Sequence, residues 1–124
     1  MEDPLMEDLI VKLFVSKSSL SRNQFFAYLV RKGEISKGEL EKIIKKEKIF
    51  RTRGALGGSF FQAKNNIRKS IYTLLLLFYL GIWSDKEEKA ILSLIKGLKR
   101  VKDTSNDRKS DVASYVIEII ENMI

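Results

Sequence analysis

Apolar residues recur every three or four positions along most of this chain, which is the spacing of one face of an α-helix. No stretch shows the strict alternation of apolar and polar positions that is typical of a half-buried strand. The sequence therefore predicts an all-α fold of about six helices, in which any pair of strands is minimal or absent. We expect them at about 4–16, 22–32, 36–48, 60–80, 84–100 and 108–123.

The helix expected at 60–80 is the element around which the others should pack. Ser59 and Gln62 have the spacing of a capping box at its start, and Gly81 suits a left-handed backbone at its end. Its apolar stripe consists of Phe60, Ala63, Ile67, Ile71, Leu74 and Phe78. From residue 74 to residue 80 the helix has no polar face, so we expect other helices to cover that half.

Cap signals support the other helices. Pro4 after Asp3 suits the first position of a helix, and Gly33 should stop the helix expected at 22–32. Two further capping boxes, Ser36 with Glu39 and Ser84 with Glu87, mark the starts of the third and fifth helices. At 124 residues we expect a single domain, residues 1–124. Its terminal helices, 4–16 and 108–123, either pack onto the core or form a dimer contact.

Composition removes several classes of chemistry. The chain contains neither cysteine nor histidine, which excludes disulfides, Cys/His zinc sites and Ser-His-Asp catalysis. Asp85, Glu87 and Glu88 could in principle bind Mg²⁺, but acids in a first helical turn mainly stabilise the helix dipole. We therefore expect no enzyme activity, no metal and no cofactor.

The apolar run from Ile71 to Trp83 is 13 residues long, against about 20 for a helix that crosses a bilayer. The acidic N-terminus lacks the basic start of a secretory signal. We expect a cytoplasmic protein without a membrane segment. Many lysines, glutamates and isoleucines with few glutamines are typical of thermophiles.

The net charge of +7 is concentrated in one segment. Residues 31–69, which we call the basic segment, contain twelve bases and four acids, whereas residues 70–124 contain eight of each. A localised excess of cations is the expected footprint of a polyanion partner. The alternative is a lysine-rich surface that only confers solubility.

A glycine-rich stretch lies inside the basic segment, from Arg51 to Ser59. As a loop before a helix N-terminus, it would let the amides of Gly57, Gly58 and Ser59 approach a phosphate, with Arg51 and Arg53 beside it. The stretch lacks the Gly-Lys-Ser/Thr ending of a nucleotide-binding loop, which favours a phosphate of a nucleic-acid backbone. The alternative is that the glycines only permit a tight turn.

A run of lysines precedes that stretch: Lys42, Lys45, Lys46 and Lys48. Such residues supply affinity for phosphates without sequence readout. The interleaved Glu39, Glu41 and Glu47 are equally compatible with a solvated charged face, because acids can pair with bases four residues away, as Glu41 can with Lys45.

From Arg22 to Trp83 the chain resembles the helix-turn-helix and winged-helix DNA-binding superfamily. The resemblance rests on a helix, the Gly33 turn, a short helix opened by Ile35-Ser36, and a long helix with a polar first half. In that family the last helix lies in the major groove. The resemblance implies that the residues facing DNA would be Gln62, Lys64, Asn65, Arg68 and Lys69.

The sequence thus favours a non-enzymatic nucleic-acid-binding protein, acting on double-stranded DNA more than on RNA, as a small transcriptional regulator or chromosomal accessory factor. Phe61 and Tyr72 are the two aromatic residues that are candidates for stacking on unpaired bases. The alternative is a helical adaptor or accessory subunit of a replication or transcription complex, which would bind an acidic protein surface. We expect no small-molecule ligand, and a homodimer is compatible with both.

Overall fold

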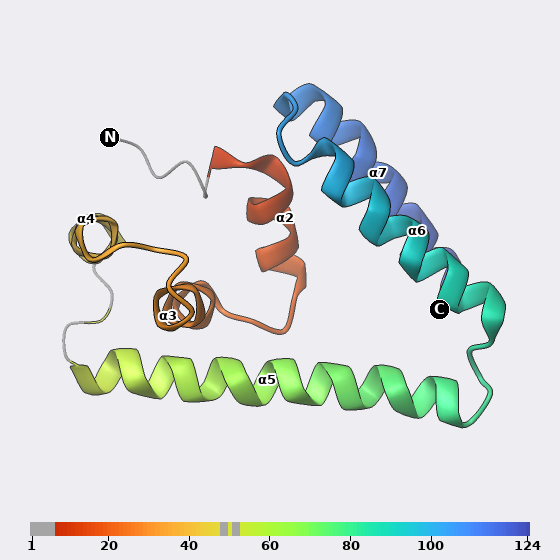
Figure 1. Ribbon diagram of the computed structural model, residues 1–124, viewed down its shortest axis with the longest axis horizontal. Helices are drawn as coiled ribbons and strands as arrows, with labels where there is room; N and C mark the ends of the chain where they lie inside the picture. Colours follow the sequence, from red (N-terminus) through yellow and green to blue (C-terminus); the bar gives the residue numbers. More distant parts are fainter. Residues whose placement is uncertain (1–6, 48–49, 51–52) are drawn as a thin grey trace. The chain divides into compact units, whose positions relative to one another are not determined.

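The computed structural model describes residues 7–47, 50 and 53–124, except the side chains of residues 46, 47 and 53. The described part contains six α-helices and no strand, which confirms the predicted all-α class (Figure 1). The helices are α2 (Leu9–Lys17), α3 (Arg22–Arg31), α4 (Lys37–Glu47), α5 (Arg53–Tyr79), α6 (Asp85–Val101) and α7 (Asn106–Met123). The Asp3-Pro4 start expected for the first helix lies outside the described residues.

The chain packs as two compact units. Val11–Tyr72 forms most of the first, and the second contains Asp8–Ile10 and Thr73–Ile124. The long helix α5 therefore contributes its first twenty residues to one unit and its last seven to the other.

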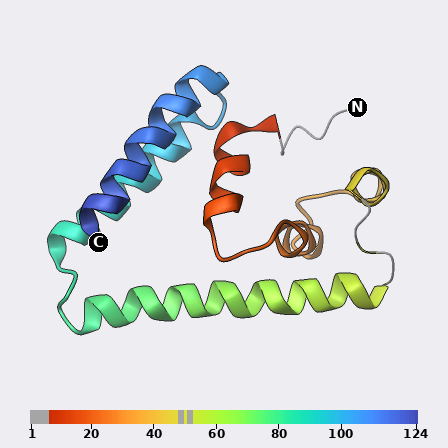
Figure 2. The same cartoon turned by 180° about the vertical axis from the view of Figure 1, so that it is seen from behind.

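The first unit is built around α3, α4 and the first half of α5. Figures 1 and 2 show α3 nearly end-on and α5 lengthwise, so the two helices cross at a large angle. Phe26, Ala27, Ile35, Ile43 and Phe50 form its buried core. Partly buried residues around this core are Phe25, Leu29, Val30, Leu40, Ile44, Leu56 and Phe60. The core of the first unit thus joins apolar residues of α3 and α4 to Leu56 and Phe60 of α5.

Local signals explain where α3 begins and ends. Ser21 and Gln24 form a capping box: Gln24 N–H donates to Ser21 Oγ (3.2 Å), and Ser21 N–H donates to Gln24 Oε1 (3.1 Å). After Arg31 the chain turns at Gly33, whose φ of 75° is cheap only for glycine. The glycine stop was predicted from the sequence, whereas the capping box was not.

The predicted start of the central helix is wrong. The helix begins at Arg53 rather than Phe60, so Gly54, Gly57 and Gly58 are helical and Ser59 is no N-cap. Glycine costs about 1 kcal/mol relative to alanine inside a helix, which is why these residues looked like a loop. Tertiary packing overrides that preference here, because Leu56 and Phe60 both pack against the core of the first unit.

The end of the central helix follows the prediction. Gly81 has a φ of 73°, and its N–H donates to the Phe78 carbonyl (3.1 Å). The next residues fold back over the helix end, with the Trp83 ring edge-on to Phe78 at 5.8 Å between centroids. At the start of α6, Ser84 N–H donates to Glu87 Oε1 (3.1 Å), as expected for the predicted capping box.

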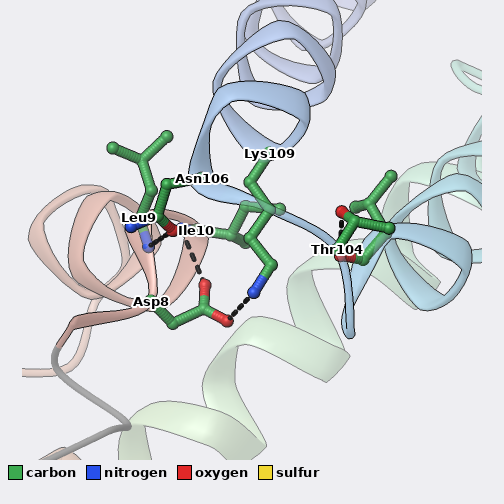
Figure 3. Close-up of polar contacts among 7 residues, drawn as sticks. Asp8, Leu9, Ile10, Thr104, Asn106 and Lys109 are labelled. Carbon is green, nitrogen blue, oxygen red and sulfur yellow. Dashed lines mark hydrogen bonds and ion pairs between the residues drawn. The ribbon is translucent and has the colours of Figure 1, made fainter.

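In the second unit α6 and α7 form a helical hairpin, lying side by side in both views (Figures 1 and 2). Leu94, Ala113 and Val116 are its buried apolar residues, and Lys109 is buried with them. Asp8–Ile10 contacts the start of α7, where Asn106 Oδ1 accepts a hydrogen bond from Leu9 N–H (3.3 Å) and Asp8 binds Lys109 (Figure 3). The last helix, α7, begins at Asn106, which is two residues earlier than the start expected from the sequence.

The expected covering of the second half of α5 is also wrong. Leu75, Leu76 and Tyr79 are 57%, 55% and 85% exposed, and even Ile71 of the predicted core stripe is 53% exposed. Ala63, earlier on the same stripe, is fully buried. An all-apolar helix segment indicates that burial would be favourable, but it does not specify what would bury it.

Candidate nucleic-acid interface on the first unit

The excess of positive charge belongs to the first unit. Val11–Tyr72 contains fifteen bases and four acids, whereas Thr73–Ile124 contains eight of each. The first unit therefore has the strong positive charge, and the second is close to neutral. We expect a polyanion to be attracted to the first unit, because charges farther apart than about 8 Å are largely screened at physiological salt and the local excess of charge therefore decides.

An aromatic ring gathers cations from two helices of that unit. The Phe60 ring on α5 has the Arg31 guanidinium 5.5 Å and the Lys64 ammonium 5.2 Å from its centroid. Tyr28 of α3 stacks against Phe60 at 6.1 Å, and Lys32 lies 5.5 Å from the Tyr28 ring. We call these five residues the Phe60 cluster.

The Phe60 cluster presents ordered charges to solvent. Arg31, Lys32 and Lys64 are exposed, whereas the two rings are half-buried. Each cation–π contact at an exposed site is worth about 0.5–1 kcal/mol, which holds long side chains that would otherwise be mobile. Cations ordered in advance lose less conformational entropy when they bind a phosphate.

The first half of α5 extends this charged surface. Lys64 and Arg68 are four residues apart and therefore neighbours on one face, with Asn65 and Lys69 beside them. Arg68 Nη1 donates to Asn65 Oδ1 at 2.7 Å. Lys64, Arg68 and Lys69 are exposed and Asn65 is half-exposed, so these four predicted residues lie together.

Gln62, another predicted contact residue, belongs to an amide network between α3 and α5. Its Oε1 accepts a hydrogen bond from Gln24 Nε2 (3.2 Å). Asn66 Nδ2 donates to Gln24 Oε1 (2.8 Å) and to the Ser19 carbonyl (3.1 Å), and Ser19 Oγ lies 3.3 Å from Ser70 Oγ. Gln62 is exposed despite this contact. The network fixes the start of α3 against the middle of α5.

The predicted lysines of α4 are on the surface. Lys42 and Lys45 are exposed, and so are the neighbouring Glu39 and Glu41. The side chain of Lys46 and the whole of Lys48 lie outside the described residues. This helix therefore presents mixed charge in its described part, in contrast to the first half of α5.

The predicted phosphate cradle is not formed. Gly57 and Gly58 lie within α5, where each N–H is directed at the carbonyl four residues earlier and not at an incoming anion. Ser59 is likewise inside the helix. Arg51 and the Arg53 side chain lie outside the described residues. The glycines thus leave one side of the helix without side chains, and the Arg31 guanidinium lies 4.0 Å from where a Gly57 Cβ would be.

Sequence reasoning missed Arg31, Lys32 and Tyr28. Their spacing of three and four residues places them together on α3, a signal that was available. Their proximity to Phe60 could not be predicted from the sequence, because it depends on how α3 crosses α5.

Glu87, one of the acids considered for a metal ion, has a structural role in this fold. Glu87 caps α6, and no group of three acidic residues suited to a metal ion occurs in the described part of the chain. Among the described helices, none is long and apolar enough to cross a membrane. Phe61 and Tyr72, the stacking candidates, are 61% and 67% exposed.

The chain matches no protein-family model, and it finds no match among curated proteins or among solved structures.

Proposed function

We propose that the protein is a non-enzymatic nucleic-acid-binding protein whose first unit contacts double-stranded DNA, as a small transcriptional regulator or chromosomal accessory factor. The observation that carries the proposal is the Phe60 cluster, in which the cationic groups of Arg31 on α3 and Lys64 on α5 both lie against the Phe60 ring. Arg68 and Lys69 continue this cationic surface along α5. Surfaces of this kind bind nucleic acid by neutralising phosphates and releasing counterions.

A helix fits the major groove of B-DNA, which favours a duplex as the ligand. In this proposal Lys64, Arg68 and Lys69 contact phosphates or guanine edges, and Asn65 contacts adenine. Arg31 and Lys32 reach the flanking backbone. Lys42 and Lys45 of α4 add attraction without readout.

The test is a binding titration with labelled duplex and single-stranded DNA at several salt concentrations. We expect the duplex to bind more tightly, with log affinity falling linearly against log salt. Tighter binding of single strands would instead support base stacking on Phe61 and Tyr72 and would contradict the duplex proposal. Absence of binding at low salt would overturn nucleic-acid binding altogether.

A charge-reversal triple separates this surface from net charge alone. Arg31→Glu, Lys64→Glu and Arg68→Glu together should make the salt slope shallower by roughly 3, because each phosphate contact contributes about 0.9. The matched control reverses three exposed lysines of α6 in the second unit, Lys89, Lys96 and Lys99. It changes the net charge equally and should leave the slope nearly unaltered. Equal effects of the two triples would contradict a defined interface.

A second candidate is a helical adaptor or accessory subunit that binds an acidic protein surface. The exposed apolar residues of α5 favour it, since such surfaces often mark protein contacts. Binding to polyglutamate but not to DNA at the same low salt would support the adaptor. The reverse result would support the proposed nucleic-acid ligand.

A further inference from the structure

The second half of α5 presents an exposed apolar face on a single continuous helix. Six large residues form it, five in α5 and Leu80 directly after the last residue of the helix, Tyr79. Their spacings of one and four residues keep them on one side. We call them the α5 face: Ile71, Tyr72, Leu75, Leu76, Tyr79 and Leu80, which are 53%, 67%, 57%, 55%, 85% and 58% exposed. No charged residue occurs between Lys69 and Asp85.

The α5 face is nearly the same read in either direction. About a point midway between Leu75 and Leu76, tyrosine at 72 corresponds to tyrosine at 79, and Ile71 to Leu80. A twofold axis at that point would place each residue opposite one of the same chemical type. Twofold interfaces require this kind of self-complementarity, in which residue i contacts j and j contacts i.

The distribution of charge along α5 selects the direction of pairing. Arg68 and Lys69 lie directly before the α5 face, and no base follows it before Lys86. In a parallel pair these cations would lie beside their own copies, and like charges at close range are unfavourable. In an antiparallel pair they lie at opposite ends, each beyond the apolar overlap.

The exposed area is sufficient for a stable pair. At about 200 Å² for a fully exposed large residue, the six exposed fractions amount to about 750 Å². Stable protein interfaces bury about 800 Å² on each partner. The face also exceeds the apolar patches of about 300–600 Å² that are usual on monomeric proteins.

We propose that the α5 face pairs with a second copy of this chain as an antiparallel homodimer, with the twofold axis between Leu75 and Leu76. Leu75 then packs on Leu76 of the other copy, and Tyr72 on Tyr79. This proposal does not depend on nucleic-acid binding, because none of these residues belongs to the Phe60 cluster or to the cationic first half of α5.

Sedimentation equilibrium of the full chain tests the association. We expect wild type to have twice the mass of one chain, and Leu76→Lys to weaken dimerisation by about a hundredfold or more. The reason is that each dimer loses two leucine contacts and gains two like charges beside the axis. Leu92→Lys on α6 is the matched control, since Leu92 is 51% exposed and lies outside the face. It should remain dimeric.

A monomer at all concentrations, or equal weakening by both substitutions, would overturn the proposal. Circular dichroism of both variants establishes that the helices are retained, so loss of dimer is not confused with unfolding.

Cysteine cross-linking tests the direction, and the chain has no native cysteine to interfere. Tyr72→Cys and Tyr79→Cys are made in separate chains, one of them carrying a size tag. The mixture should form a mixed disulfide, whereas neither variant alone should cross-link efficiently. Equivalent positions are seven residues apart along the antiparallel pair, about 10 Å, which exceeds the reach of a disulfide. Efficient cross-linking of each variant alone, or of no combination, would overturn antiparallel pairing.

Discussion

Lys109 on α7 donates a hydrogen bond to Asp8, 101 positions earlier in the chain, with 2.7 Å between Nζ and Oδ2 (Figure 3). The lysine side chain is only 9% exposed and the aspartate side chain 20%. The other carboxylate oxygen accepts from Ile10 N–H at 2.9 Å, so Asp8 also caps the start of α2. One carboxylate thus fixes a helix start and compensates a buried ammonium.

The two partners of this ion pair should respond differently to substitution. Asp8→Ala leaves the Lys109 ammonium buried without its carboxylate and removes a cap, so we expect a loss of about 2–4 kcal/mol in unfolding free energy. Lys109→Met removes the buried ammonium, and the Asp8 carboxylate that remains is 20% exposed and still accepts from Ile10 N–H, so this change should cost less than Asp8→Ala. Urea unfolding followed by circular dichroism gives both values, and the opposite order would contradict this role of the pair.

The amide network predicts a coupling between α3 and α5. Gln24→Ala and Asn66→Ala each break the 2.8 Å hydrogen bond between them, so the double variant should lose less stability than the sum of the single variants. We expect a coupling of about 0.5–1.5 kcal/mol from a double-mutant cycle. The exposed Asn65–Arg68 pair, within one helix, is the control and should couple by less than about 0.5 kcal/mol. Strict additivity at Gln24 and Asn66 would show that the network contributes nothing.

Two glycines should respond oppositely to alanine. Gly58 is helical, and no neighbouring side chain or other helix lies within 4 Å of where an alanine methyl would be, so Gly58→Ala should raise the unfolding free energy by about 0.5–1 kcal/mol. Gly81 has a φ of 73°, so Gly81→Ala should lower it by about 1–2 kcal/mol. Thermal unfolding of both variants checks this. If Gly58→Ala instead lowers the unfolding free energy, that result would favour a loop at residues 51–59, as predicted from the sequence. If the same variant also binds DNA more weakly, that result would favour the predicted phosphate-binding site in this loop.

Much of the fold follows from local pattern, because helix periodicity, caps and stops involve residues within one or two turns. The apolar sides of α3 and α4, the glycine stops at 33 and 81, and the start of α6 all belong to this class. The helix-turn-helix resemblance also implied that Lys64, Asn65, Arg68 and Lys69 would face one partner. The contact between Arg31 and Phe60 could not be predicted from the sequence. It joins residues of α3 and α5, and the way these two helices cross is not determined by any short segment of the chain.

By itself, the sequence determined that the chain is helical and that its excess of positive charge lies in residues 31–69, because composition and periodicity are properties of the chain read in order. Only the tertiary structure decided where α5 begins, because Leu56 and Phe60 gain enough from packing to carry three glycines into a helix. Only the tertiary structure decided, too, that Asp8 meets Lys109 and that the second half of α5 stays exposed. An apolar stripe specifies that a face favours burial, whereas its partner is set by contacts far apart in sequence or, as we propose here, in a second chain.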